Sequence, residues 1–214
     1  MSESYFAEFG TDKFIRENFF ADISYQGVMV EVGAATPEFL SMSQHFRLSG
    51  WRCIGIEPNP KYVEMHQKRG NEIHAFACSD EDQDDQDFEI VHTGENYEGA
   101  EITDHSFSAL KVVDEYKRMH AHYDSLKVIK AKVNVRKLDT ILESLGVEHV
   151  DLVAVDVEGW ELAVMRGFNT KKFKPKVVVL ENYLHKNEYV QYMSGLGYVL
   201  STRIEYNYIF KRGI

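Results

Sequence analysis

Short apolar runs alternate with segments of helical periodicity along most of this chain. Four of the runs consist almost entirely of apolar residues, and they occupy positions 28–32, 53–56, 152–155 and 177–180. Runs of this kind are typical of parallel strands that are buried on both faces. Near the C-terminus, Tyr206, Tyr208 and Phe210 alternate with more polar residues. The pattern therefore predicts a doubly wound α/β sheet that ends in a C-terminal β-hairpin.

The segments outside these apolar runs are predicted one by one from their own residues. Residues 1–26 are predicted to form a helical lead-in, which leaves residues 27–214 as the main domain. Other predicted segments include strands at 73–78, 88–91 and 129–135, a solvated acidic loop at 80–87, a loop at 93–106 that could fold over a site, and a helix at 107–125.

The first apolar run ends at Gly33 and the second ends at Glu57, with a helical pattern between them. The positions at helical spacing are Phe39, Met42, Ser43 and Phe46. A strand, a glycine turn, a helix and a second strand that ends in an acid describe a nucleotide-binding βαβ unit. Glu57 lies near the spacing of roughly 20 residues at which such an acid meets the ribose hydroxyls.

This glycine turn carries only one of the three glycines that a dinucleotide fingerprint uses to hold a pyrophosphate. Gly33 is followed by Ala34, Ala35, Thr36 and Pro37. A ligand with a ribose and a base but no phosphate, such as S-adenosylmethionine, does not need the glycines that hold a pyrophosphate. The alternative for this stretch is a buried strand and turn that bind nothing.

Composition narrows the class of protein. With 214 residues, 44% of them hydrophobic and 27% charged, the chain is expected to be one soluble globular domain. A net charge of −10 argues against a nucleic-acid binder. No apolar run approaches the roughly 20 residues of a membrane span, and no signal peptide is recognised at the start. Cys53 and Cys78 are expected to be free buried thiols, and no Cys/His metal spacing is present, so a cytoplasmic location is expected.

Acidic side chains lie at or just after the ends of the predicted central strands. They are Glu31, Glu57, Asp156 with Glu158, and Glu181. In an open α/β sheet, ligands bind outside the carboxyl ends of the strands. A single acid there is usually a loop carboxylate or a helix cap. Because several strands end in acids, we expect a site at this edge.

Six segments of the chain resemble those of the FkbM-type methyltransferases, in the same order. They are FGTDKFI, EVGAAT, GWRCIGIEPNP, KLDTILE, DLVAVDVEGWE and KVVVLEN. DVEGWE after a buried strand is the most specific of them, and the resemblance covers most of the chain. It implies a seven-stranded Rossmann-like sheet that binds S-adenosylmethionine. It also implies transfer of a methyl group to oxygen, commonly a hydroxyl of a sugar or a natural product.

The resemblance also implies the cofactor-binding residues. Position by position, they are Glu31, Gly33 and Ala34 in the first motif, Glu57, Pro58 and Asn59 for the ribose, Ala77, Cys78 and Ser79 for the adenine, and Asp156 for the methionine end and the reacting methyl. The chain departs from the family pattern at Ala35 and Pro37, where asparagine and glycine are usual. Proline at this point removes a backbone N–H and stiffens the turn.

Methyl transfer to a hydroxyl benefits from a general base, and Asp156, Glu181 and His185 are the candidates because each lies at or after the end of a central strand. No metal ligands are assigned, although Asp156 and Glu181 could hold a hard cation. The expected partner is a small-molecule or glycan acceptor with a free hydroxyl, not nucleic acid or a membrane. Two other functions remain open: a nicotinamide-dependent oxidoreductase, and a non-catalytic binding module with the same fold.

Overall fold

The computed structural model describes residues 4–92, 108–112, 114, 118 and 127–213. The predicted loop at 93–106 lies outside the described residues, as does most of the predicted helix at 107–125. The described start of that helix is not helical, because Ala109 forms an isolated β-bridge with Glu89 instead.

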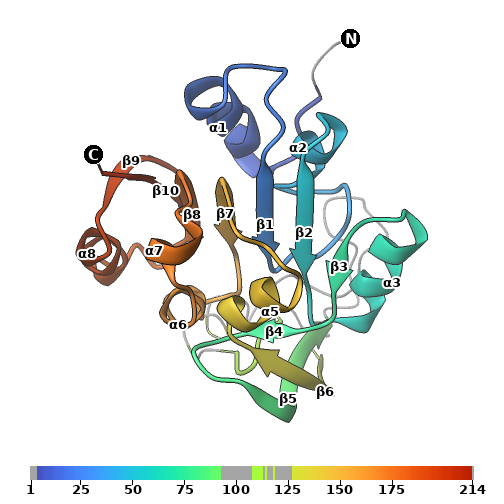
Figure 1. Ribbon diagram of the computed structural model, residues 1–214. Helices are drawn as coiled ribbons and strands as arrows, with labels where there is room; N and C mark the ends of the chain where they lie inside the picture. The colour runs from blue at the N-terminus through green and yellow to red at the C-terminus, as the bar shows by residue number, and fades with distance from the viewer. Residues whose placement is uncertain (1–3, 93–107, 113, 115–117, 119–126, 214) are drawn as a thin grey trace.

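The main sheet has seven strands in the order β3-β2-β1-β7-β8-β10-β9 (Figure 1). Its strands are β1 (Val28–Val32), β2 (Arg52–Ile56), β3 (Ile73–His74), β7 (Leu152–Val155), β8 (Val177–Glu181), β9 (Tyr198–Ile204) and β10 (Asn207–Arg212). The first five pair in parallel, while β9 and β10 form an antiparallel hairpin that pairs with β8. The predicted seven-stranded α/β sheet with a C-terminal hairpin is therefore confirmed.

Helices cover both faces of the main sheet, as the apolar runs require. They are η1 (Glu8–Gly10), α1 (Thr11–Phe19), α2 (Gln44–Leu48), α3 (Pro60–Lys68), α5 (Leu138–Ser144), α6 (Glu161–Arg166), α7 (Thr170–Phe173) and α8 (Glu188–Gly195). Val30 and Val32 of β1 pack in the cluster that contains residues of α5 to α8, whereas Met29 packs with residues of α1 and α2. In the described part of the chain, no helix is both long and apolar enough to cross a bilayer.

A second, three-stranded sheet lies beyond the carboxyl ends of β1 and β2 (Figure 1). Its strands are β4 (Ala77–Cys78), β5 (Gln83–His92) and β6 (Lys127–Arg136). The single strand predicted at 73–78 is therefore wrong, since its two halves belong to different sheets. The reason is that β2 ends at Ile56, opposite His74, so the chain loses its partner there and pairs with β6 from Ala77 onward.

The acidic run at 80–87 is a loop only at its start, because residues 83–87 belong to β5. Lysines on the neighbouring strand balance the acids: Asp87 pairs with Lys130 at 3.2 Å and with Lys132 at 2.9 Å. Opposite charges across two strands stabilise the pairing modestly, so an acidic segment can form a strand when its partner is basic.

The helix predicted after Gly33 begins later than its apolar spacing indicates. Backbone N–H groups of Met42 and Ser43 donate to the carboxylate of Glu31 at 2.7 and 3.3 Å. Leu40 has a φ of 57°, which no right-handed helix accommodates. The segment before Gln44 is therefore irregular, and only α2 is helical.

Candidate functional site

A pocket opens between the carboxyl ends of the central strands and the second sheet. It encloses about 660 Å³, including space open to solvent. Its walls come from both sheets and from segments at 108–110 and 156–160. The lining residues are Val32, Gly33, Ala35, Ile56, Glu57, Pro58, Asn59, Tyr62, Phe76, Ala77, Cys78, Phe88, Ser108, Ala109, Leu110, Asp156, Val157 and Trp160. This is the edge at which open α/β sheets bind ligands.

Glu57 lines the pocket and is held rigidly by the backbone. Its Oε2 accepts from the N–H of Ala35 at 2.9 Å, and its Oε1 accepts from the N–H of Asn59 at 2.7 Å. The Asn59 side chain in turn caps α3 by accepting from the N–H of Lys61 at 3.1 Å. Each oxygen of Glu57 has a second lone pair, so the carboxylate can still accept two hydrogen bonds from a ligand.

Burial raises the pKa of Glu57 to about 7, although the backbone hydrogen bonds from Asn59 and Ala35 lower it. Between its ordinary value of 4.5 and about 7, the folded protein binds more protons at Glu57 than the unfolded chain does. The free energy of unfolding from this group therefore falls as the pH rises through that window, by about 3 kcal/mol in total. We expect the difference in unfolding free energy between the ligand-free parent and Glu57→Gln to shift by this amount between pH 4.5 and pH 8. Urea unfolding at several pH values measures it, and equal pH slopes would contradict it.

One wall of the pocket is apolar and comes from the second sheet. Ala77 and Cys78 are buried in β4, Phe88 is buried in β5, and Phe76 adds an aromatic ring between the sheets. Burial raises the pKa of the Cys78 thiol, so the group stays protonated and uncharged. A flat, uncharged ring system suits such a wall.

Gly33 allows the turn that follows β1 to pack directly against the end of β7. Its φ is 84°, and a Cβ at this position would lie 1.8 Å from the backbone oxygen of Asp156. The glycine is therefore required for contact between two parts of the protein, in addition to any approach of a ligand.

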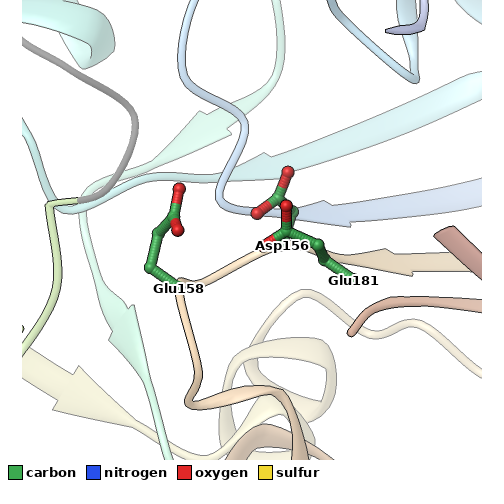
Figure 2. Close-up of side chains that lie close together, drawn as sticks. All are labelled: Asp156, Glu158 and Glu181. Carbon is green, nitrogen blue, oxygen red and sulfur yellow. The ribbon is translucent and has the colours of Figure 1, made fainter. Parts of the chain in front are cut away.

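Three carboxylates gather where β7 and β8 end (Figure 2). Asp156 and Glu158 follow β7, and Glu181 is the last residue of β8. One oxygen from each lies within 4.8 Å of the other two. Asp156 lines the same pocket as Glu57, so the carboxylate group borders this space.

The electrostatic surroundings of this group are strongly acidic. Desolvation raises the pKa of each of the three carboxyls, although residue Asp156 is itself exposed. Repulsion from Glu161 raises the pKa of all three further. Repulsion from Asp156 also raises the pKa of Glu158 and Glu181, whereas a hydrogen bond with Glu181 lowers that of Asp156. Glu8, from the N-terminal segment, acts in the same direction on Asp156 and Glu158. A raised pKa brings a carboxyl toward the range in which it can exchange protons near neutral pH.

Glu161 itself organises the turn rather than facing the pocket. Its Oε1 accepts from the N–H groups of Val157 at 3.1 Å and Gly159 at 2.9 Å. Its Oε2 accepts from the hydroxyl of Tyr189 at 2.5 Å. These bonds fix the left-handed conformation of Glu158, whose φ is 59°. Within the DVEGWE segment, Glu161 thus positions Asp156 and Glu158.

Several residues predicted for the site lie elsewhere. Glu31 does not line the pocket, because its carboxylate is occupied by Met42 and Ser43. Ala34 lies behind the turn, with its N–H on the carbonyl of Ile56 at 3.2 Å.

Ser79 and His185 are likewise outside the pocket lining. The Ser79 hydroxyl donates to Asp80 at 3.1 Å. His185 is exposed, and its Nδ1 lies 3.3 Å from the hydroxyl of Tyr208. The predicted residues that do line the pocket are Gly33, Glu57, Pro58, Asn59, Ala77, Cys78 and Asp156, while Glu181 joins Asp156 in the carboxylate group.

Glu158 was predicted only as one of the strand-end acids, without a catalytic or cofactor role, and the aromatic residues of the pocket were not predicted for the site. Glu158 is visible in the DVEGWE motif, but its strained backbone, which turns the side chain toward Asp156, is not. Phe76 and Phe88 carried no signal beyond their apolar character, because the second sheet, which contains Phe88 and follows directly after Phe76, was not predicted. Trp160 is part of the DVEGWE motif, but the motif does not indicate that its ring lines the pocket.

Comparisons with known proteins place the chain in a family. The model of the Methyltransferase FkbM domain matches residues 31–200. A search among curated proteins found no significant match. One similar solved structure is the precorrin-6y C5,15-methyltransferase from Geobacter metallireducens GS-15, with a TM-score of 0.43 and 13% identity over 97% of this chain and 91% of that chain. Since the domain model spans most of the chain and includes the pocket turn, Glu57 and the three carboxylates, this protein belongs to the FkbM methyltransferase family.

Proposed function

We propose that the protein is an S-adenosylmethionine-dependent O-methyltransferase that acts on a hydroxyl of a sugar, a glycan or a natural product. The observation that carries this proposal is the placement of Glu57. Its carboxylate lines a pocket that is also lined by an apolar wall and by Asp156. A nucleoside with a charged sulfonium arm needs these three environments.

The residues present fit this cofactor. Glu57 has two free lone pairs for the ribose hydroxyls, and Ala77 and Cys78 offer the adenine an uncharged wall. Asp156 and the acids beside it favour the positive sulfonium. None of the described lining residues is Lys, Arg or His, so nothing basic is available for a pyrophosphate. This disfavours the alternative of a nicotinamide-dependent oxidoreductase.

When bound, the cofactor supplies an electrophilic methyl group on a good leaving group. The protein must then align the acceptor hydroxyl with that methyl and exclude water. Asp156 is the group best placed to orient the hydroxyl and take its proton, because it lines the pocket and its pKa is raised. Glu181 stands beside it as the second acceptor of a proton.

Aromatic rings that follow the end of β8 favour an acceptor with a flat or apolar face, such as a sugar ring. Tyr183 follows β8 and contacts Tyr206, with ring centroids 5.0 Å apart. Phe9 packs edge-on against Tyr206 at 5.3 Å and is 52% exposed. Aromatic faces with a few polar groups nearby are typical of small-molecule sites. The acidic surroundings disfavour a phosphate-rich acceptor.

Glu57→Ala is expected to weaken S-adenosylmethionine binding by roughly ten- to a hundredfold, because charge-assisted hydrogen bonds contribute on the order of 1.5–3 kcal/mol. Isothermal calorimetry with S-adenosylmethionine and S-adenosylhomocysteine measures the change, with circular dichroism as the folding control. Parent-like affinity in the variant would show that the ribose lies elsewhere.

The proposed function itself is tested on the parent protein. No binding of either ligand at millimolar concentration would overturn it, and binding of NADH would favour the oxidoreductase. Labelled methyl transfer onto a panel of glycans and small hydroxyl compounds, with mass spectrometry of the products, identifies the acceptor. Cofactor binding without transfer to any of them would favour a non-catalytic module.

A further inference from the structure

The three carboxylates that border the pocket have the geometry of a cation site. Asp156, Glu158 and Glu181 come from two neighbouring strand ends, and one oxygen of each lies within 4.8 Å of the others (Figure 2). Oxygens on opposite sides of one ion lie about 4 Å apart for Mg²⁺ and about 5 Å apart for Ca²⁺. We propose that these three side chains bind a hard divalent cation at the acceptor end of the pocket.

Glu181 supplies an independent observation. Its side chain is almost fully buried, with 7% of the residue exposed, and its Oε2 has no hydrogen-bond partner among the described residues. A buried carboxylate oxygen without a partner is costly, since it loses its hydration and gains nothing in return. A cation between the three carboxylates satisfies this oxygen.

The described neighbours of the group do not neutralise it. Glu161 and Glu8 add negative charge, and the ion pairs formed among the described residues include none of Asp156, Glu158 and Glu181. The competing arrangement is a proton shared between Asp156 and Glu181. That proton offsets one of the three charges and joins two of the carboxylates, whereas a divalent cation offsets two charges and contacts all three, so the cation accounts for more of what is observed.

The role of the cation in methyl transfer rests on the proposed function, whereas its binding does not. Next to Asp156, the ion faces the space assigned to the acceptor hydroxyl. A divalent cation lowers the pKa of an oxygen that it binds, and it holds that oxygen in a fixed position. With the ion bound, Asp156 acts as a ligand that orients the hydroxyl through the metal.

The test uses the full chain after treatment with EDTA and measures Mn²⁺ binding by electron paramagnetic resonance at pH 7.5. The parent is expected to bind one tight Mn²⁺, and Glu158→Gln and Glu181→Gln are each expected to weaken it by roughly tenfold or more, because affinity follows the number of charged ligands. Asp87→Asn, in the acidic run of β5, is the matched control and should bind like the parent. No tight site in the parent, or equal affinity in all variants, would overturn the proposal.

Thermal unfolding gives a second readout that does not depend on activity. Mn²⁺ should raise the melting temperature of the parent and of Asp87→Asn, but much less that of Glu158→Gln and Glu181→Gln. Without metal, the two glutamine variants should melt at or above the parent, because each removes a charge from an uncompensated group. A metal effect retained in both variants would refute the site. Calorimetry with S-adenosylhomocysteine, run separately, shows whether the cofactor site fails instead.

Discussion

Gly33→Ala is expected to destabilise the protein by about 4 kcal/mol or more, which is among the largest effects that a single small substitution produces. Two costs add. The residue has a φ of 84°, where an L side chain is strained, and its new Cβ would meet the backbone oxygen of Asp156 at 1.8 Å. A backbone atom of a central strand end cannot move aside without shifting β7. Urea unfolding followed by circular dichroism measures the loss.

Gly70→Ala separates the two costs. Gly70 has a similar φ of 70°, but a Cβ there has no atom within 4 Å. This control carries only the conformational strain, so we expect it to cost about 1–2 kcal/mol. If both variants lost the same stability, the contact between the Gly33 turn and the end of β7 would not be as close as described.

The contact between the Gly33 turn and the end of β7 also fixes the shape of the pocket. Gly33 and Asp156 both line it, and Glu57 holds the next residue but one, Ala35, through a backbone hydrogen bond of 2.9 Å. The turn after β1, the acid after β2 and the acid after β7 are therefore fixed against each other before any ligand binds. Preorganisation of this kind reduces what a ligand must order on binding.

The central sheet and the strand-end acids could be predicted because each follows from a local rule. An apolar run such as 177–180 can be buried only in the interior of a sheet, and the carboxyl ends of parallel strands meet at one edge. Glu57, Asp156 and Glu181 were found in this way. The same rule placed Glu31 at the site, and this prediction was wrong, because Met42 and Ser43 donate hydrogen bonds to both oxygens of its carboxylate.

The second sheet could not be predicted because no local rule describes it. Residues 77–78 of β4 continue the pattern that predicted one strand at 73–78, and β5 begins in an acidic run that predicted a loop, so neither pattern indicates a separate sheet. Their pairing depends on β6, which follows more than thirty positions after the end of β5. The apolar wall of the pocket was missed for this reason, although Ala77 and Cys78 were named through the family resemblance.

Asp156→Asn is expected to lower turnover by roughly 10²- to 10⁴-fold, the usual contribution of a positioned proton acceptor, while S-adenosylmethionine binds within about threefold of the parent. The amide keeps the size of the side chain but can neither accept a proton nor act as a charged ligand. The prediction thus holds whether Asp156 acts directly or through a cation. Turnover of the identified acceptor and calorimetry of cofactor binding, measured side by side, check it.

Two further measurements distinguish this role from a structural one. The pKa of Asp156 is raised by burial and by Glu161, so the charged form is disfavoured and stability from this group is lost as the pH rises through the raised pKa. Asp156→Asn should consequently be as stable as the parent at pH 8 or more stable, whereas a structural residue would lose stability when replaced. In the parent, kcat/KM should fall as the pH drops through this pKa, because the protonated acid cannot accept the hydroxyl proton, and this dependence should disappear in the variant. An unstable variant that retains the parent's pH profile would assign the proton transfer to another residue, with Glu181 as the next to replace.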